Sequence, residues 1–352
     1  MLPLNDPKRI WENLFQQKWS RLAHHNVKGW DFVLSHFTKG EPTNPHGANV
    51  PGLPEFLASL DLPAIRPFFY SQHRVLRATV GAPYIYGQDD GTTSTDLFSR
   101  SYPNAFAFCG HAHLTNTDER AIWQDGFTCI AVPSLRYNMT GIGRENGVGM
   151  DDPPDRGAPV YSHQWLKDGA AQGLFVSLTV SGATIRRWDF SHDGVLGPDW
   201  HVPFPTTRTK PYQPAVRSEA EPIPQFAADA QIAIHCRIAP DRTGTKREMF
   251  VVEFPQALHA ATAPRADDYS VRLEMKCGTV ERILNERRFF SEDYAMREDP
   301  ARPLRCNFPK DEVPLNRLLR FTVIPNTAFG HSGKPLSSPW RKFEWKTEEE
   351  TI

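Results

Sequence analysis

The stretch "NAFAFCGHAHLTNTDE", residues 104–119, joins an apolar run directly to a glycine and two histidines. Residues 105–109 are all apolar, which predicts a short strand buried on both faces. Gly110 allows a tight bend where that strand ends. His111 and His113 are two positions apart and can point the same way, and neutral imidazole is a good ligand for zinc, iron and related cations. The stretch therefore predicts a metal-binding loop at the end of a buried strand.

A second apolar strand ends in the same way. Residues 66–73, "RPFFYSQH", run from aromatic residues to a polar residue and then to His73. Open sheets place their ligands at the C-terminal ends of such strands. We therefore expect His73, His111 and His113 to converge on one site, with Arg74 directly beside it.

The surrounding pattern predicts mixed strands and helices over the first 200 residues. Asp6-Pro7 is typical of a helix start, and apolar residues at helical spacing predict a helix over 7–24, with His24 and His25 near its C-terminal end. A strand is expected over 29–37 and a hairpin over 173–190. Together these elements indicate an α/β fold.

The composition changes near residue 203. The segment 203–226 is rich in proline and polar residues, which is typical of a linker, and the remainder alternates short strands with turns. The predicted organisation is a first domain over 1–204, a linker over 205–222 and a small all-β sandwich over 223–352.

"FAFCGHAH" (106–113), preceded by "PFFYSQH" (67–73), resembles the C-terminal half of a calcineurin-like metallophosphoesterase. The resemblance covers residues 1 to about 204. It implies a layered α/β (α+β) sheet core and metal-dependent hydrolysis of a phosphate ester. It also implies a dinuclear centre of two divalent ions (Mn, Fe or Zn), with His73, His111 and His113 as ligands. The tail resembles a fibronectin type III-like sandwich.

The motifs of the family's first half are missing from this sequence. Asp-x-His occurs once, at Asp199–His201, after the Gly-His-x-His and so in the wrong order. We therefore expect a core that is incomplete at its N-terminus. Two dications close together repel each other strongly and need carboxylates between them. A chain that offers three neutral ligands should hold at most one ion weakly, and should be inactive alone.

The sequence also bounds the partners. Lys plus Arg number 40 and Asp plus Glu 41, without a basic run, which argues against nucleic acid. No apolar stretch reaches the roughly 20 residues of a membrane span, and no signal-peptide core precedes residue 15, so a soluble protein of undecided compartment is expected. Arg136 and Tyr137 could contact a substrate phosphate, and a surface salt bridge is the competing interpretation of Arg136. The resemblance implies a phosphoester substrate, and either a separate N-terminal half or self-association at an exposed sheet edge.

Two alternatives remain open at this point. The chain could be a non-catalytic remnant or binding module that works through its β-sandwich tail. It could also be a cupin-like single-metal protein, since Glu119 and Gly126 follow His113 at suitable distances, although Ala105 stands where a cupin has glycine.

Overall fold

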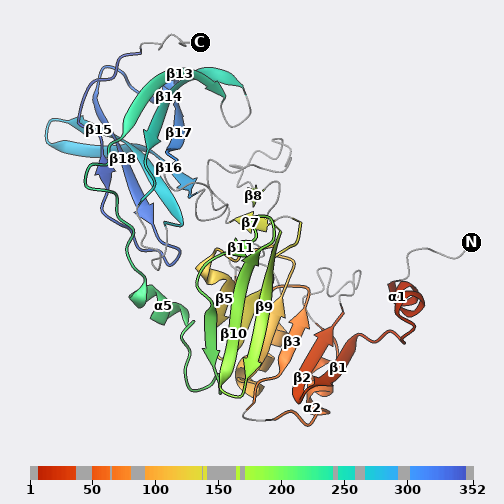
Figure 1. The fold of residues 1–352 in the computed structure, drawn as a ribbon. Coiled ribbons are helices and arrows are strands. Elements are labelled where there is room, and N and C mark those ends of the chain that lie inside the picture. Colours follow the sequence, from red (N-terminus) through yellow and green to blue (C-terminus); the bar gives the residue numbers. More distant parts are fainter. Residues whose placement is uncertain are drawn as a thin grey trace, which may run out of the picture.

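A computed structural model describes residues 7–36, 50–63, 66–80, 92–136, 138–140, 164–166, 171–240, 245–257, 266–291 and 302–345. These residues form two units, each with its own apolar core (Figure 1). The helices are α1 (Pro7–Phe15), α2 (Leu53–Ala58), α4 (Thr92–Ser101) and α5 (Pro214–Ala220), with 3₁₀ turns η1 (Glu119–Ala121) and η3 (Lys310–Glu312). None of the helices in these ranges has the length and hydropathy needed to cross a bilayer.

The first unit is built on a six-stranded sheet in the order β1-β2-β3-β4-β6-β5. Its strands are β1 (Leu22–Val27), β2 (Trp30–Ser35), β3 (Phe69–Gln72), β4 (Phe106–Cys109), β5 (Ile122–Gln124) and β6 (Thr128–Ala131). The four central strands β2, β3, β4 and β6 are parallel, while β1 and β5 are antiparallel edges. The C-terminal ends of β3 and β4 therefore meet at the same edge of the sheet.

A second sheet packs against this one around a shared core. It consists of β9 (Gln172–Thr179), β10 (Gly182–Asp189), β11 (Gly194–Val195) and β12 (Trp200–Pro203). The expected hairpin over 173–190 is present as β9 and β10, which turn at Val180–Ser181. A small separate pair is formed by β7 (Asn138–Thr140) and β8 (Gln164–Leu166).

The predicted α/β (α+β) layered metallophosphoesterase core is wrong as a fold class. The described residues are mostly β-structure in several sheets, with four short α-helices. The physical reason lies in what covers the parallel strands. Alternate residues of β3 face opposite sides: Tyr70 packs on Phe98 of α4, with ring centroids 4.9 Å apart, whereas Phe69 lies on the side of Phe32 and Phe106. The second side belongs to the core shared with the β9–β12 sheet, which contributes the buried Ile185. Apolar strands require burial on both faces, and here a second sheet supplies much of it.

The helix expected over 7–24 is also wrong in its second half. α1 ends at Phe15, and Leu22–Val27 forms β1, which returns into β2 through Lys28-Gly29. Both turn residues have positive φ, 52° and 82°, as in a type I′ hairpin turn. His24 consequently lies on a strand, where its Nε2 is 3.0 Å from Asp31 Oδ1.

The second unit has two antiparallel sheets around one apolar cluster. One sheet has the order β13-β14-β17 and the other β16-β15-β18-β19. The strands are β13 (Ala233–Pro240), β14 (Lys246–Phe254), β15 (Asp268–Cys277), β16 (Val280–Phe290), β17 (Leu304–Pro309), β18 (Leu318–Asn326) and β19 (Leu336–Ser337). Buried Tyr269 accepts a hydrogen bond from the Ala257 amide, 2.8 Å away.

Polar contacts join the two units. Arg120 Nη2 lies 3.2 Å from Asp267 Oδ1, and Arg120 Nη1 donates to the Ala328 carbonyl over the same distance. Ser218 of α5, within the predicted linker, contacts His331 Nε2 at 2.8 Å. The linker boundaries themselves stay a prediction.

Candidate functional site

The structure brings His73 and His111 together. They follow β3 and β4, which are adjacent and parallel, and His111 Nδ1 lies 2.9 Å from His73 Nε2. The ring centroids are 4.7 Å apart. The backbones are also near each other, because a Cβ added at Gly110 would stand 3.4 Å from the His73 carbonyl oxygen. That distance is ordinary van der Waals contact, so the approach of the two strand ends does not itself require glycine.

The two histidines of the Gly-His-x-His motif have an unusual backbone conformation. His111 has φ 62° and His113 φ 46°, both in the left-handed region, and the Ala112 amide donates to the Gly110 carbonyl at 2.7 Å. Histidine enters this region more often than most residues, yet each such conformation costs about 1–3 kcal/mol. Strain of this kind persists where surrounding structure enforces it, and it gathers at functional sites.

His73 is held in its neutral form. Burial lowers the pKa of its imidazole below the ordinary value, and the charges of Arg74 and His113 lower it further. The unprotonated ring has a lone pair available for a metal ion or a proton. His113 is thus close enough to act on His73 electrostatically.

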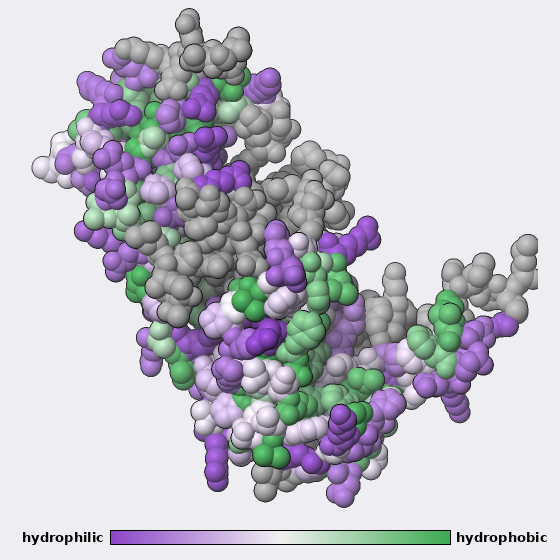
Figure 2. Space-filling model, viewed as in Figure 1, coloured by the Kyte–Doolittle hydropathy of each residue, from purple (hydrophilic) through white to green (hydrophobic). Residues whose placement is uncertain are grey.

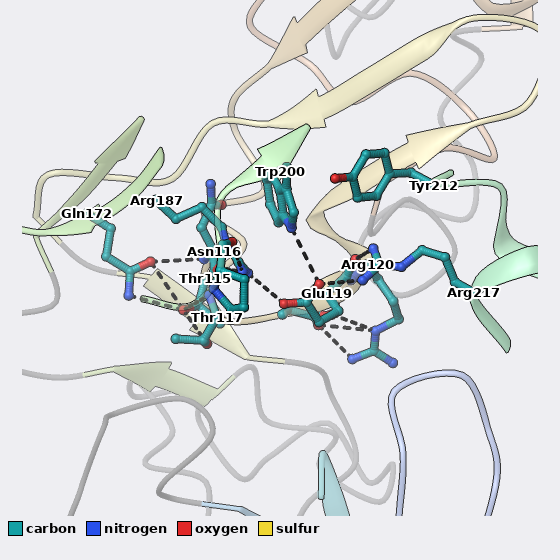
Figure 3. Close-up of polar contacts among 12 residues, drawn as sticks. Thr115, Asn116, Thr117, Glu119, Arg120, Gln172, Arg187, Trp200, Tyr212 and Arg217 are labelled. Atoms are coloured by element: carbon teal, nitrogen blue, oxygen red, sulfur yellow. Dashed lines mark hydrogen bonds and ion pairs between the residues drawn. The ribbon is translucent and has the colours of Figure 1, made fainter. Parts of the chain in front are cut away.

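The loop after His113 is fixed by a buried polar network (Figure 3). Gln172, the first residue of β9, accepts a hydrogen bond from the Asn116 amide at 3.0 Å and contacts Thr115 Oγ1 through both ends of its own amide. Thr115 Oγ1 also lies 2.9 Å from Thr117 Oγ1. These residues are almost fully buried, so the network ties the histidine loop to the second sheet.

A charged cluster closes the far end of the same loop. Arg187 of β10 is 1% exposed and donates to the Asn116 carbonyl (3.0 Å), to Glu119 Oε1 (2.7 Å) and to the Pro198 carbonyl (2.6 Å). Glu119 Oε2 also pairs with Arg217 of α5. Burial by itself raises the pKa of Glu119, but the charges of Arg187 and Arg217 outweigh it and hold that pKa below the ordinary value.

The remaining residues that the sequence singled out have other contacts or lie outside the described residues. Arg136 is exposed, and its amide donates to Ser134 Oγ at 3.1 Å, while Tyr137 lies outside the described residues. Asp199 pairs with Arg186, and His201 Nδ1 lies 3.1 Å from Thr184 Oγ1, so the late Asp-x-His has structural contacts. Glu119, the carboxylate that a cupin would use, is engaged by two arginines.

The donor set fits a dinuclear metal centre poorly. Within the ranges that the structure describes, no group of three or more His, Cys, Asp or Glu side chains is arranged to hold a metal ion. Two dications need negative ligands to offset their repulsion, and the paired imidazoles provide none. What the described residues offer is a pair of imidazoles, His73 and His111, whose ring nitrogens already lie 2.9 Å apart.

Sequence reasoning missed Gln172 and Arg187 as supports of the loop. Gln172 opens a strand whose next residues are apolar, and Arg187 occupies an inward position of a strand. A buried arginine at such a position requires a carboxylate partner. The sequence feature that could have predicted this pair is Glu119 in "LTNTDER" (114–120), close after the histidines. Comparison with protein-family models, curated proteins and solved structures gives no match to this chain.

Proposed function

We propose that His73 and His111, with His113 beside them, are the histidine part of a metal site for phosphoester hydrolysis. The observation that carries this is the 2.9 Å contact between His111 Nδ1 and His73 Nε2, made by residues that end two adjacent parallel strands. The left-handed conformations of His111 and His113 add support, because backbone strain of this kind gathers at functional sites.

The chain's own residues have defined parts in this proposal. His73 and His111 present nitrogen donors, the Gln172 network holds the loop that carries His113, and the depressed pKa of His73 keeps its donor unprotonated near neutrality. Bound metal would polarise the phosphoryl group and activate water. The carboxylates for two ions would come from outside the described residues, and Arg136 with Tyr137 is the candidate contact for the substrate phosphate.

The alternative is that the site binds no metal and that the protein acts as a non-catalytic binding module. The antiparallel second unit, whose core is independent of the histidines, motivates this possibility. Whether the histidine pair binds zinc distinguishes the metal-site proposal from this alternative.

Zinc titrated calorimetrically into the full chain should bind in one weak step that depends on the histidine pair. His73→Ala and His111→Ala should each weaken that step about tenfold or more, because each removes a donor. The matched control is His25→Ala, an exposed histidine of β1 in the same sheet, which should bind as the wild type does. Thermal melts should show that all variants fold.

Activity gives the second readout. With manganese, zinc or iron, the chain should hydrolyse aryl phosphate mono- and diesters little or not at all, since its histidines provide no negative charge to offset two dications. Turnover abolished by His111→Ala would support the function and place the missing carboxylates in this chain. Zinc binding that is unchanged in both histidine variants would contradict the proposal.

A further inference from the structure

Among the described residues, one edge of the strand β9 has no strand beside it and lacks the usual protection against pairing. In the described part of the chain, β9 pairs with β10 alone. Its sequence, Gln172–Thr179 "QGLFVSLT", has no charge, no proline and no bulge in its register with β10. Natural edge strands are normally short, charged, bulged or covered, because their unpaired backbone groups invite another strand. By contrast, β1, the edge of the first sheet, carries His24, His25 and Asn26.

The direction of the free backbone groups follows from the hairpin register. Thr179 and Gly182 flank the two-residue turn, so they exchange hydrogen bonds, and every second residue from there back along β9 also faces β10. The amides and carbonyls of Leu174, Val176 and Leu178 therefore point away from β10. The backbone N–H of Gln172 points the same way, and it donates to the Ser134 carbonyl at 3.0 Å, at one end of this edge.

Apolar surface lies open along this edge. Val176 stands opposite fully buried Ile185 in the register, so both face the first sheet, yet Val176 is 37% exposed. On the outer face Phe175 is 53% exposed, and Val180 in the turn is 95% exposed. Figure 2 shows hydrophobic side chains at the surface in the region that Figure 1 assigns to β9 and β10.

The first sheet is also open on this side. β2 turns Trp30, Phe32 and Leu34 to one face, and all three are only half-buried, whereas Val33 on the opposite face is fully buried. The ring contacts of Phe32 with Phe69 and of Trp30 with Phe204 place this face towards the second sheet. In Figure 1, β2 and β1 of the first sheet extend past β9, which is the edge strand of the second sheet. The second sheet therefore leaves part of the first sheet uncovered on this side.

We infer that the edge of β9 is a strand-addition site for another polypeptide. An extended segment with apolar residues at alternate positions would bond to the outward backbone groups of Leu174, Val176 and Leu178. Its inward side chains would cover Val176 and the open face of β2. This is β-augmentation, in which backbone hydrogen bonds supply affinity and alternate side chains supply specificity.

A second copy of the chain does not fit as the occupant. Two copies paired antiparallel through β9 would be related by a two-fold axis perpendicular to the sheet, so their first sheets would lie in one layer. Because β2 and β1 project past β9 in each copy, the two projections would occupy the same space. The partner is therefore a different polypeptide, with a free strand and no layer behind it. None of the residues that form this edge belongs to the histidine pair.

The probe is a fluorescein-labelled peptide that copies residues 172–180 between flanking lysines, with its central valine replaced by proline in the control peptide. Fluorescence anisotropy should show that the first peptide binds the full chain and that the control binds at least about tenfold more weakly, since proline removes a donor. Val176→Lys in the protein should weaken binding by a similar factor, because a charged edge resists pairing. Val195→Lys, at an exposed valine of β11, should bind as the wild type does.

Two further measurements locate the contact. Hydrogen exchange should slow at the amides of Leu174, Val176 and Leu178 when the peptide is added, and not at β1. Light scattering should give a monomer, and zinc binding should be the same in Val176→Lys as in the wild type. Equal affinity for both peptides, or protection elsewhere than β9, would overturn the inference. A dimer that Val176→Lys converts to monomer would overturn the exclusion of a second copy.

Discussion

Replacing Arg187 with methionine should lower the free energy of unfolding by about 3–5 kcal/mol, because the change removes a buried guanidinium that joins two segments and leaves Glu119 with Arg217 as its remaining arginine partner. Arg187 is 1% exposed and bonds to Glu119 and the Asn116 carbonyl in the loop after His113, and to the Pro198 carbonyl before β12. Its guanidinium also lies 4.4 Å from the centre of the Trp200 ring. Urea denaturation of the full chain, followed by tryptophan fluorescence, measures the change.

The neighbouring arginine provides the matched control. Arg186 lies on the opposite face of β10, its side chain is 55% exposed, and it pairs with Asp199. Arg186→Met should therefore cost less than about 1 kcal/mol. Equal losses in the two variants would contradict the account of the buried cluster.

The acid dependence of the Arg187 effect follows from Glu119. Because the pKa of Glu119 is lower in the folded protein than in the unfolded chain, its ion pairs contribute full stability above the unfolded pKa. That contribution is lost as the pH falls through the folded pKa. The difference between wild type and Arg187→Met should accordingly narrow in acid.

Phe106→Ala should also lower the free energy of unfolding by about 3–5 kcal/mol. Phe106 is fully buried at the centre of the parallel sheet, with ring centroids 5.5 Å from Phe69 and 5.4 Å from Phe108. Truncation would leave a cavity between strands that carry His73 and His111. Phe190→Ala, at a 48% exposed phenylalanine, is the control and should change stability by less than about 1 kcal/mol. A small effect of Phe106→Ala would mean that the sheet is not close-packed there.

The strands that carry the histidines could be predicted because their signal is local. An apolar run followed by a polar residue or glycine marks β3 and β4, and parallel pairing then brings His73 and His111 together. The layer that covers these strands could not be predicted in the same way. A hairpin was expected over 173–190, but its packing across the parallel sheet depends on Ile185 and Trp200, which are distant in sequence from β3 and β4. The local pattern does not reveal that packing, and the α/β fold class was therefore wrong.

The wrong helix prediction over residues 16–24 has a different cause. Apolar residues at helical spacing continue past Phe15, where α1 ends. Periodicity alone therefore does not show where the helix ends. The Lys28-Gly29 turn, which requires positive φ at both residues, decides that Leu22–Val27 pairs with β2. The hairpin turn thus determines the structure here, and helical spacing does not. The two histidines of β1, which were expected near the end of a helix, lie on an edge strand of the sheet.

Anomalous diffraction at the zinc edge, from crystals of the full chain soaked in zinc chloride, tests the central claim most directly. We expect a zinc ion about 2.0–2.1 Å from a ring nitrogen of His73 and from one of His111. These two bonds to zinc would replace the contact between His111 Nδ1 and His73 Nε2. A zinc ion found only at another pair, such as His24 with Asp31 or His192 with Asp189, would contradict the account, and so would the absence of zinc from the His73–His111 pair.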